Sequence, residues 1–342
     1  MPIRPEVRPP QWRYLMKPAF RFLTVLATVA LLSGALAQTT LKLGHIRDTA
    51  HPTHLGAVQF AELVEEKTEG RVTVDVFPDS QLGGIQDMFV QIQTGDLEMV
   101  YGGINTLAFI NGGEPFEITA IPFLYRDYEH MRAALLSDWF EPIFADVEEQ
   151  TGIKVINVAG DTAPRGLSAN KPIYGPADFE RLKIRTAASE VVLRSMQTLG
   201  ALPQQIAFAD LYVALRTNVV DAQENGAITV VNASLWEVQP YYMKTDYIRD
   251  IETFYVNPDT WNGLSEADQQ AILDASEEAG ALVTELTQAQ LDEAYATLEA
   301  NVTVIREPEL DLAGIREALE GTFLDWDGDK WPEGTLEFIR GL

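Results

Sequence analysis

Arg185 is the side chain of this sequence with the clearest means of binding a charged ligand. The residues before it, Leu182-Lys183-Ile184, alternate apolar and polar, which predicts a short half-buried strand that ends at Arg185. A guanidinium at a strand end presents a rigid fork of donors that matches a carboxylate. The alternative is a weak surface ion pair with a neighbouring Asp or Glu, and these residues alone leave both roles open.

Helices are expected to follow this strand and to hold it in place. Apolar residues recur at helical spacing from Ser189 to Leu199, and Gly200 then provides a C-cap. A second helix is expected over 208–215, before the chain turns back toward a strand. Near the start of the chain, residues 40–77 show a strand, a helix and a second strand. This alternation predicts an α/β fold with a mostly parallel sheet that binds ligands at the carboxyl ends of its strands.

The stretch around Arg185 resembles the solute-binding proteins of TRAP transporters (tripartite ATP-independent periplasmic transporters), the DctP family. No single dipeptide carries the resemblance, but the ordered series is specific to that family. It continues over nearly all of the chain that follows the N-terminal leader, for example at His51-Pro52, Phe77-Pro78 and Gln81-Leu82-Gly83. The matching residues around Arg185 are Arg165, Ser168, Lys171-Pro172-Ile173, Asp178, Leu182-Lys183-Ile184-Arg185, Ser189, Gly200-Ala201, Pro203, Ala207-Phe208, Leu211-Tyr212, Ala214-Leu215, Thr217, Val220-Asp221 and Gln223-Glu224-Asn225.

The resemblance implies a periplasmic-binding-protein fold, with two α/β lobes, a hinge cleft and a long helix that braces both lobes. Lobe I is expected to comprise residues 38–160 and 251–290, and lobe II residues 161–250 and 291–342. The bracing helix is expected over 267–301, with Ser265 as its N-cap. By the same resemblance, the chain is expected to be a monomeric periplasmic subunit that captures a small organic acid and delivers it to a membrane permease.

The resemblance also assigns roles to individual side chains. Arg185 is expected to clamp the carboxylate of the solute, and Arg165 and Asn225 to complete the polar shell around it. Phe208 stands where the family places an aromatic ring that packs on the body of the ligand. A solvated hinge arginine remains the alternative for Arg165, and a core phenylalanine the alternative for Phe208.

The remaining wall of the site is less well defined by the sequence. His45, at the end of the first strand, is expected to face the cleft, and Asn105 is expected either to reach the ligand or to cap the next helix. Glu224 is expected to hold Arg185 or a neighbouring backbone group. Sialic-acid-binding members carry an acidic residue where this chain has Gly103, which argues against sialic acid. Tyr247 stands where family members often have a histidine.

The N-terminal residues 1–37 have the pattern of a signal peptide. Basic residues precede an apolar run over 22–32, and Ala35-Leu36-Ala37 provides a small-x-small cleavage site, so the mature chain is expected to begin at Gln38. The true start is either Met1 or Met16. An uncleaved membrane anchor is the alternative, although the apolar run is short for a spanning helix.

Composition excludes several classes of function. The formal net charge is -26, and removing residues 1–37, which are mainly basic, makes it more negative; such a chain is not expected to bind nucleic acid. It has no cysteine and shows neither a G-x-S-x-G elbow nor a phosphate-binding glycine loop, so we expect neither an enzyme nor a cofactor. A glycosidase-like carboxylate pair stays open. His51 and His54 have metal-site spacing but no second ligand cluster nearby, so no metal is expected.

Two questions remain open at the level of the sequence. A sensory module that feeds a receptor or a histidine kinase would use the same fold as a transport subunit. A sugar acid and a dicarboxylate both fit one arginine clamp with a polar shell around it.

Overall fold

The computed structural model describes residues 38–342, and the expected signal peptide lies outside them. Their first sheet has the strand order β2-β1-β3-β10-β4. The strand β1 pairs in parallel with β2 and β3, whereas β10 pairs antiparallel with β3 and β4. The strands are β1 (Thr39–Gly44), β2 (Val72–Phe77), β3 (Met99–Gly103), β4 (Lys154–Val155) and β10 (Glu252–Val256).

A second sheet has the order β11-β9-β5-β8-β6-β7. Its strand β5 is antiparallel to both β8 and β9, while β6 is parallel to β7 and β8. Among the described strands each sheet is therefore mostly parallel, as expected, and one strand in each, β10 in the first sheet and β5 in the second, runs in the reverse direction. The strands are β5 (Arg165–Ala169), β6 (Lys183–Thr186), β7 (Leu202–Gln205), β8 (Ala222–Gly226), β9 (Tyr241–Ile248) and β11 (Thr303–Ile305).

The helices begin and end where the sequence signals them. Ser189 caps α6 by accepting a hydrogen bond from the Val192 N–H, and Gly95 ends α3 in the left-handed conformation. The α-helices are α2 (Pro52–Lys67), α3 (Ile85–Thr94), α4 (Tyr128–Leu135), α5 (Glu141–Thr151), α6 (Glu190–Thr198), α7 (Leu211–Arg216), α8 (Ala227–Asn232), α9 (Pro258–Gly263), α10 (Glu266–Asn301), α11 (Leu312–Leu319) and α12 (Thr335–Gly341). The short 3₁₀ helices are η2 (Ile104–Phe109), η3 (Glu114–Ala120), η4 (Pro176–Phe179), η5 (Phe208–Asp210), η6 (Leu235–Glu237) and η7 (Leu324–Trp326).

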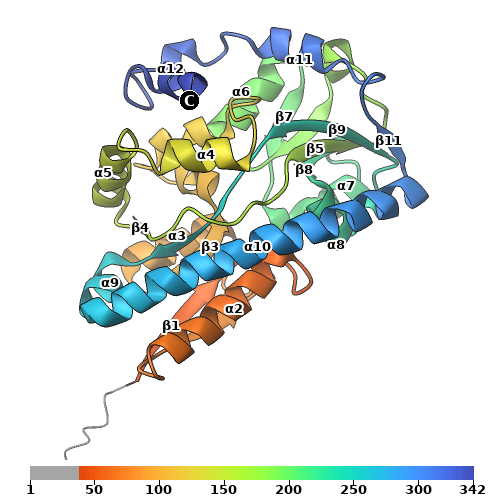
Figure 1. Cartoon of the computed structure of the whole chain (residues 1–342). Helices are drawn as coiled ribbons and strands as arrows, with labels where there is room; N and C mark the ends of the chain where they lie inside the picture. The colour runs from red at the N-terminus through yellow and green to blue at the C-terminus, as the bar shows by residue number, and fades with distance from the viewer. Residues whose placement is uncertain (1–37) are drawn as a thin grey trace, which may run out of the picture. The chain divides into compact units, whose positions relative to one another are not determined.

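The predicted long helix is present as α10, and its N-cap is Ser265. Its first half packs against α2 through apolar residues such as Ile272 and Val283. Its second half packs against α8 through Ala294 and Leu298. Figure 1 shows α10 running past α2 and then α8, so that one rigid element touches helices of both sheets. We call each sheet with its packed helices a lobe, the first lobe containing β1 and the second lobe β5.

The chain passes between the lobes at two adjacent segments, and it crosses a third time along α10, between β10 of the first sheet and β11 of the second. It leaves the first sheet after Val155, enters the second at Arg165, and returns between Ile248 and Glu252. The two crossings meet at an antiparallel bridge between Asp161 and Ile251. The predicted boundaries at 160/161 and 250/251 fall within these segments, and the third, at 290/291, falls within α10; the division into lobes stays a prediction.

The C-terminal tail has contacts that the expected lobe boundaries do not describe. The carbonyl of Ile339 in α12 lies 2.9 Å from the ring nitrogen Nε2 of His130 in α4. The rings of Trp139 and Phe338 stack with their centroids 5.0 Å apart. The tail was expected to belong to lobe II, yet α12 packs on residues 130–139, which were expected in lobe I.

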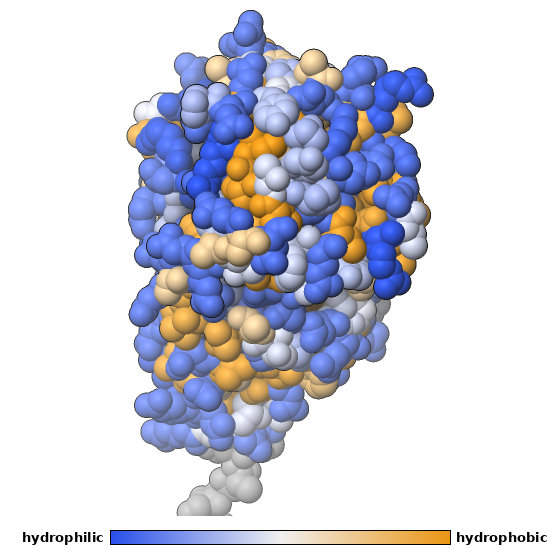
Figure 2. Space-filling view, turned by 90° about the vertical axis from the view of Figure 1, so that its right-hand side faces the viewer, coloured by the Kyte–Doolittle hydropathy of each residue, from blue (hydrophilic) through white to orange (hydrophobic). Residues whose placement is uncertain are grey.

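The outer surface is mainly hydrophilic on the face that Figure 2 draws. Apolar side chains gather on this face in separate patches (Figure 2). Within residues 38–342, no helix combines the length and the apolar character needed to cross a bilayer.

Gly280 allows α10 to approach the first crossing segment closely, and we expect Gly280→Ala to destabilise the fold. An added Cβ would lie 2.6 Å from the carbonyl oxygen of Ala159, which is backbone and cannot rotate away. Overpacking of this kind costs about 1–3 kcal/mol, more than the roughly 1 kcal/mol that alanine gains over glycine in a helix. Urea unfolding measures the change. Gly263→Ala is the matched control, because nothing lies within 4 Å of its added Cβ, and equal stability of the two variants would contradict this account.

Candidate functional site

The two lobes line one cavity of about 540 Å³, a volume typical of small-molecule sites. On the side of the second lobe, β6 and β8 end at the cavity edge. Because β5 runs antiparallel to β8, its first residue, Arg165, lies at that same edge. Three predicted site residues on these strands, Arg165, Arg185 and Asn225, therefore line one wall.

The first lobe supplies the opposite wall, again from the ends of parallel strands and the start of an antiparallel one. Arg47 follows the end of β1, and Asn105 follows the end of β3. The strand β10 is antiparallel to β3, so its first residue, Glu252, and the preceding Asp250 also reach the cavity. Arg47, Asp250 and Glu252 were not predicted as site residues. Their signal in the sequence is two acidic residues at alternate positions, Asp250 and Glu252, at the start of an apolar strand.

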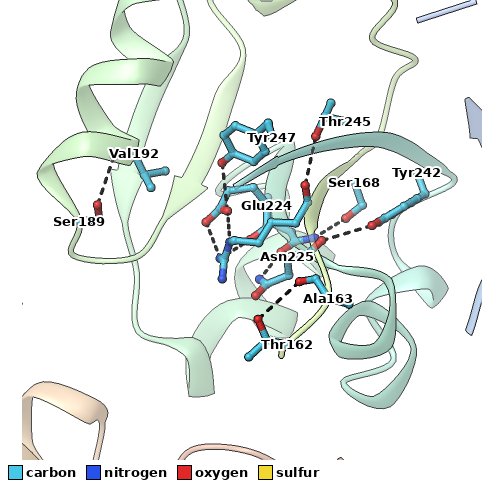
Figure 3. Close-up of polar contacts among 12 residues, drawn as sticks. Thr162, Ala163, Ser168, Ser189, Val192, Glu224, Asn225, Tyr242, Thr245 and Tyr247 are labelled. Atoms are coloured by element: carbon cyan, nitrogen blue, oxygen red, sulfur yellow. Dashed lines mark hydrogen bonds and ion pairs between the residues drawn. The ribbon is translucent and has the colours of Figure 1, made fainter. Parts of the chain in front are cut away.

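Glu224 compensates the charge of Arg165. Two guanidinium nitrogens of Arg165 donate to the two carboxylate oxygens, with Nη2 and Oε1 2.7 Å apart, and Tyr247 donates its hydroxyl to Oε2 at 3.0 Å. Figure 3 shows Tyr247 and Glu224 pointing toward each other; they come from β9 and β8, the two strands on either side of β5. Burial alone would lower the pKa of Arg165, but the Glu224 carboxylate outweighs it and holds that pKa above its usual value. The expectation that Glu224 holds Arg185 is therefore wrong.

The register of the strands explains this pairing. Arg165 lies opposite Gly226 in the antiparallel β5–β8 pair, which makes Glu224 its diagonal neighbour. Long side chains on diagonal positions of an antiparallel pair are within reach of each other. Tyr247, which replaces the family's usual histidine, completes the set of donors to Glu224.

Arg185 is buried without a carboxylate partner. It is 3% exposed, and its Nε donates to the carbonyl of Ile206 at 2.8 Å. Among residues 38–342, no carboxylate oxygen lies within 4.0 Å of its guanidinium. Burial lowers the pKa of Arg185 to about 10, against the attraction of Glu224 and with the help of repulsion from Arg165 and Arg47. The side chain is still charged at neutral pH and retains donors for an anion.

Asn225 is held in place by a chain of two side-chain hydrogen bonds. Its Nδ2 donates to Gln223 Oε1 at 2.6 Å, and Gln223 donates to the Ser168 hydroxyl at 2.8 Å. Gln223 lies directly opposite Arg185 in the parallel β6–β8 pair. These hydrogen bonds therefore set the position of the Asn225 amide on the strand next to Arg185.

Phe208 lines the cavity and contacts a charge from the other lobe. The Arg47 guanidinium carbon lies 5.1 Å from the centroid of the Phe208 ring, within the range of a cation–π interaction. No ligand is present in the structure, so the stacking of Phe208 on a solute stays a prediction. Arg47 carries a third guanidinium into the cavity.

The structure separates the two candidates His45 and Asn105. Asn105 lines the cavity, and the N-cap of the next helix is Gly103, so Asn105 is not the cap. His45 is fully buried away from the cavity lining, with Nε2 3.1 Å from Nδ1 of His54 in α2. Burial, with repulsion from His54 and Arg47, lowers the pKa of His45 to about 3, so the ring is neutral. The expectation that it faces the cleft is not met; the residues after it, 46–47, line the cavity instead.

The acidic residues of the first lobe are held by the backbone and by one hydroxyl. Asp250 Oδ1 accepts from the N–H groups of Ile251 at 3.0 Å and Asn105 at 3.5 Å. Glu252 Oε1 accepts from the Thr53 hydroxyl at 2.9 Å. Burial, together with repulsion from Glu252, raises the pKa of Asp250 to about 7, and burial also raises the pKa of Glu252. Within the described residues, no group of three or more His, Asp or Glu side chains is arranged to hold a metal ion.

Two α/β lobes around a cavity with a buried, unpaired guanidinium define the class of solute-binding proteins. Comparison with known families agrees, since the model for bacterial extracellular solute-binding proteins of family 7 (DctP) matches residues 43–325. The chain belongs to this family, the solute-binding proteins of TRAP transporters.

Three relatives show the range of solutes in the family. The 2,3-diketo-L-gulonate-binding periplasmic protein of Escherichia coli strain K12 is 29% identical over 91% of this chain and 94% of its own length. The C4-dicarboxylate-binding periplasmic protein of Rhodobacter capsulatus is 31% identical over 69% of this chain and 71% of its own. The crystal structure of a TRAP solute-binding protein from Roseobacter denitrificans with bound L-galactonate is 29% identical, has a TM-score of 0.78, and covers 84% of this chain and 94% of its own.

Removing the charge of Glu224 should be far more damaging than removing the charge of an exposed partner. Glu224→Gln leaves the buried Arg165 guanidinium without compensation, which costs about 3–5 kcal/mol in comparable buried pairs. Denaturant unfolding measures the loss. The control is Asp325→Asn, which breaks the exposed pair with Arg194 and should have little effect. A loss for Glu224→Gln no larger than for the control would contradict a structural role for this pair.

The stability of the protein should fall with rising pH because of Asp250. Its pKa in the folded state is about 7, against an ordinary value of 3.8, so the folded chain holds a proton that the unfolded chain has already lost. The free energy of unfolding contributed by this group therefore decreases from about pH 4 to pH 7 and is flat above that.

Asp250→Asn isolates this effect from the other carboxylates. The melting temperature of the variant relative to the unmodified protein should rise across the same interval and level off above pH 7. A difference that does not change between pH 4 and 7 would mean that Asp250 is ionised at its ordinary pKa.

Proposed function

We propose that this chain is the periplasmic subunit of a TRAP transporter that captures a small organic acid between its lobes. In this proposal the lobes close about the two crossing segments, and the closed form delivers the solute to the membrane permease. The observation that carries the proposal is the Arg185 guanidinium, which is buried in the cavity with no carboxylate within 4.0 Å among the described residues.

The contrast between the two predicted arginines supports a division of roles. Arg165 donates from Nε and Nη2 to Glu224, so its guanidinium has little capacity for bidentate binding of a second carboxylate. Arg185 uses Nε for the Ile206 carbonyl and keeps both terminal nitrogens for a ligand. We therefore assign the carboxylate clamp to Arg185, with Asn225 beside it and Arg165 as a secondary positive charge. Relatives named for 2,3-diketo-L-gulonate and C4-dicarboxylates are consistent with an anionic solute.

Arg185→Ala should weaken binding of the organic acid by roughly 2–5 kcal/mol, because the carboxylate of the ligand is then buried without its partner. A thermal-shift screen against organic acids, sugar acids and matched neutral sugars identifies the ligand, since a bound solute raises the melting temperature. Isothermal titration then compares the variants.

Arg216→Ala is the control, because Arg216 is an exposed arginine of α7 that does not line the cavity. Stabilisation by neutral sugars alone would overturn the assignment of Arg185 as a carboxylate clamp. An Arg185→Ala protein that folds normally and binds the acid with unchanged affinity would do the same.

A further inference from the structure

The first-lobe wall of the cavity carries buried polar atoms that lack a partner. Glu252 is 1% exposed and Tyr101 is fully buried, and both line the cavity. Within residues 38–342, neither Glu252 Oε2 nor the Tyr101 hydroxyl makes a hydrogen bond. Native proteins leave few buried polar atoms in this state, so the pair indicates a place where a ligand supplies the missing partners.

A third acceptor lies beside them. Asp250 uses Oδ1 for two backbone N–H groups, and no described residue donates to Oδ2. A Cβ on Gly103 would lie 2.0 Å from Oδ2, so the glycine in β3 is what gives this carboxylate its space in the cavity wall.

The two walls therefore differ in what they can recognise. The second lobe offers the donors of Arg185 at the edge of its sheet, whereas the first lobe offers carboxylate oxygens, which only accept while they are ionised. Arg47 offsets part of the acidic charge, since both Asp250 and Glu252 stabilise its cationic form. Its guanidinium also lies on the Phe208 ring. Above pH 7, where Asp250 is ionised, a second carboxylate on the ligand would meet like charge here, which makes a dicarboxylate a poor fit.

A solute hydroxyl suits this wall better than an ammonium does. A hydroxyl donates one hydrogen bond and accepts others, so it can donate to Glu252 while it accepts from Tyr101. An ammonium group has donors only and would leave the phenol hydroxyl without an acceptor. Burial holds the pKa of Tyr101 well above its usual value, so this hydroxyl keeps its proton and remains a donor.

Resting on the proposed function, we infer that the solute is a polyhydroxylated monocarboxylate, with its carboxylate at Arg185 and its hydroxyls on Asp250, Glu252 and Tyr101. Once they are ionised, the same two carboxylates exclude dicarboxylates. In chemical terms the ligand is a sugar acid, and Asp250 and Glu252 determine its selection.

Isothermal titration above pH 7, where Asp250 is ionised, tests the inference on the purified mature chain with a matched set of six-carbon acids. The set contains the stereoisomeric hexonates and hexuronates, the hexarates with a second carboxylate, hexanoate without hydroxyls, adipate, and 6-aminohexanoate. At least one hexonate or hexuronate should bind about tenfold or more tighter than any hexarate or adipate. Hexanoate should be weaker than the best sugar acid by roughly a hundredfold or more, because it leaves the acceptors unpaired.

Amide variants, which keep the size of each acidic side chain but remove its charge, test whether Asp250 and Glu252 select the sugar acid over the hexarate. Glu252→Gln and Asp250→Asn should each weaken the sugar acid by about tenfold and improve the hexarate relative to it. Asp292→Asn and Glu293→Gln, exposed carboxylates on α10, are matched controls that should change neither affinity. Circular dichroism and melting temperature confirm that each variant is folded before its affinities are compared.

The outcomes separate this inference from the proposed function. Tightest binding of a dicarboxylate or of 6-aminohexanoate, lost in Arg185→Ala, would overturn the inference and leave the organic-acid site standing. An unchanged ratio of sugar acid to hexarate in both cavity variants would also overturn it, as would the absence of binding by every sugar acid. Sugar-acid binding that survives Arg185→Ala would instead contradict the proposed function.

Discussion

The ion pair between Glu224 and Arg165 decides which positive charge of the cavity is available to a ligand. Three guanidiniums reach the cavity, and each resists burial because its charge is taken out of water. Glu224 is completely buried and its side-chain oxygens accept from Arg165 and Tyr247, whereas neither of them lies within 4.0 Å of the Arg185 guanidinium. The β5–β8 register places Glu224 beside Arg165 and so decides which arginine it pairs with. The selectivity of this wall therefore depends on strand pairing more than on the number of arginines.

The reversed strands are what bring the two lobes' functional groups together. In a sheet of parallel strands only residues at or after the strand ends reach the binding edge. Here β5 and β10 run against their neighbours, so the start of each strand reaches that edge as well and delivers Arg165 and Glu252. Each reversed strand also follows directly from a crossing segment, and the crossings are tied to each other by the Asp161–Ile251 bridge. Binding groups and crossings are thus neighbours along the chain, and a change of lobe angle acts directly on the positions of Arg165 and Glu252.

Local signals in the sequence were sufficient for most elements and for part of the site. Helical spacing and capping located α6 and α10, and the ordered family motif named Arg185, Asn225 and Phe208, which all line the cavity. The motif could not identify Asp250 or Glu252, because their approach depends on pairing between β3 and β10, strands far apart in the sequence, nor Arg47, which follows β1. Contacts between distant elements also explain why Glu224 pairs with Arg165 and not with Arg185 as expected. The packing of α12 on Trp139 is a contact of the same kind. Periodicity describes the face of one element, whereas these contacts require knowledge of which elements meet.

The strongly negative chain makes recognition of an anion a short-range event. With a formal net charge of -26, the protein as a whole repels an anion, and at physiological salt this repulsion is screened beyond about 8 Å. Attraction therefore has to come from groups that the ligand touches inside the cavity, where the low dielectric strengthens each contact. The free donors of Arg185 lie on the second-lobe wall, and the unpaired atoms Glu252 Oε2 and the Tyr101 hydroxyl lie on the first-lobe wall, so a solute bound to one wall leaves the polar atoms of the other unpaired. Only a solute between both walls satisfies the two sets at once, which couples recognition of the ligand to the relative position of the lobes.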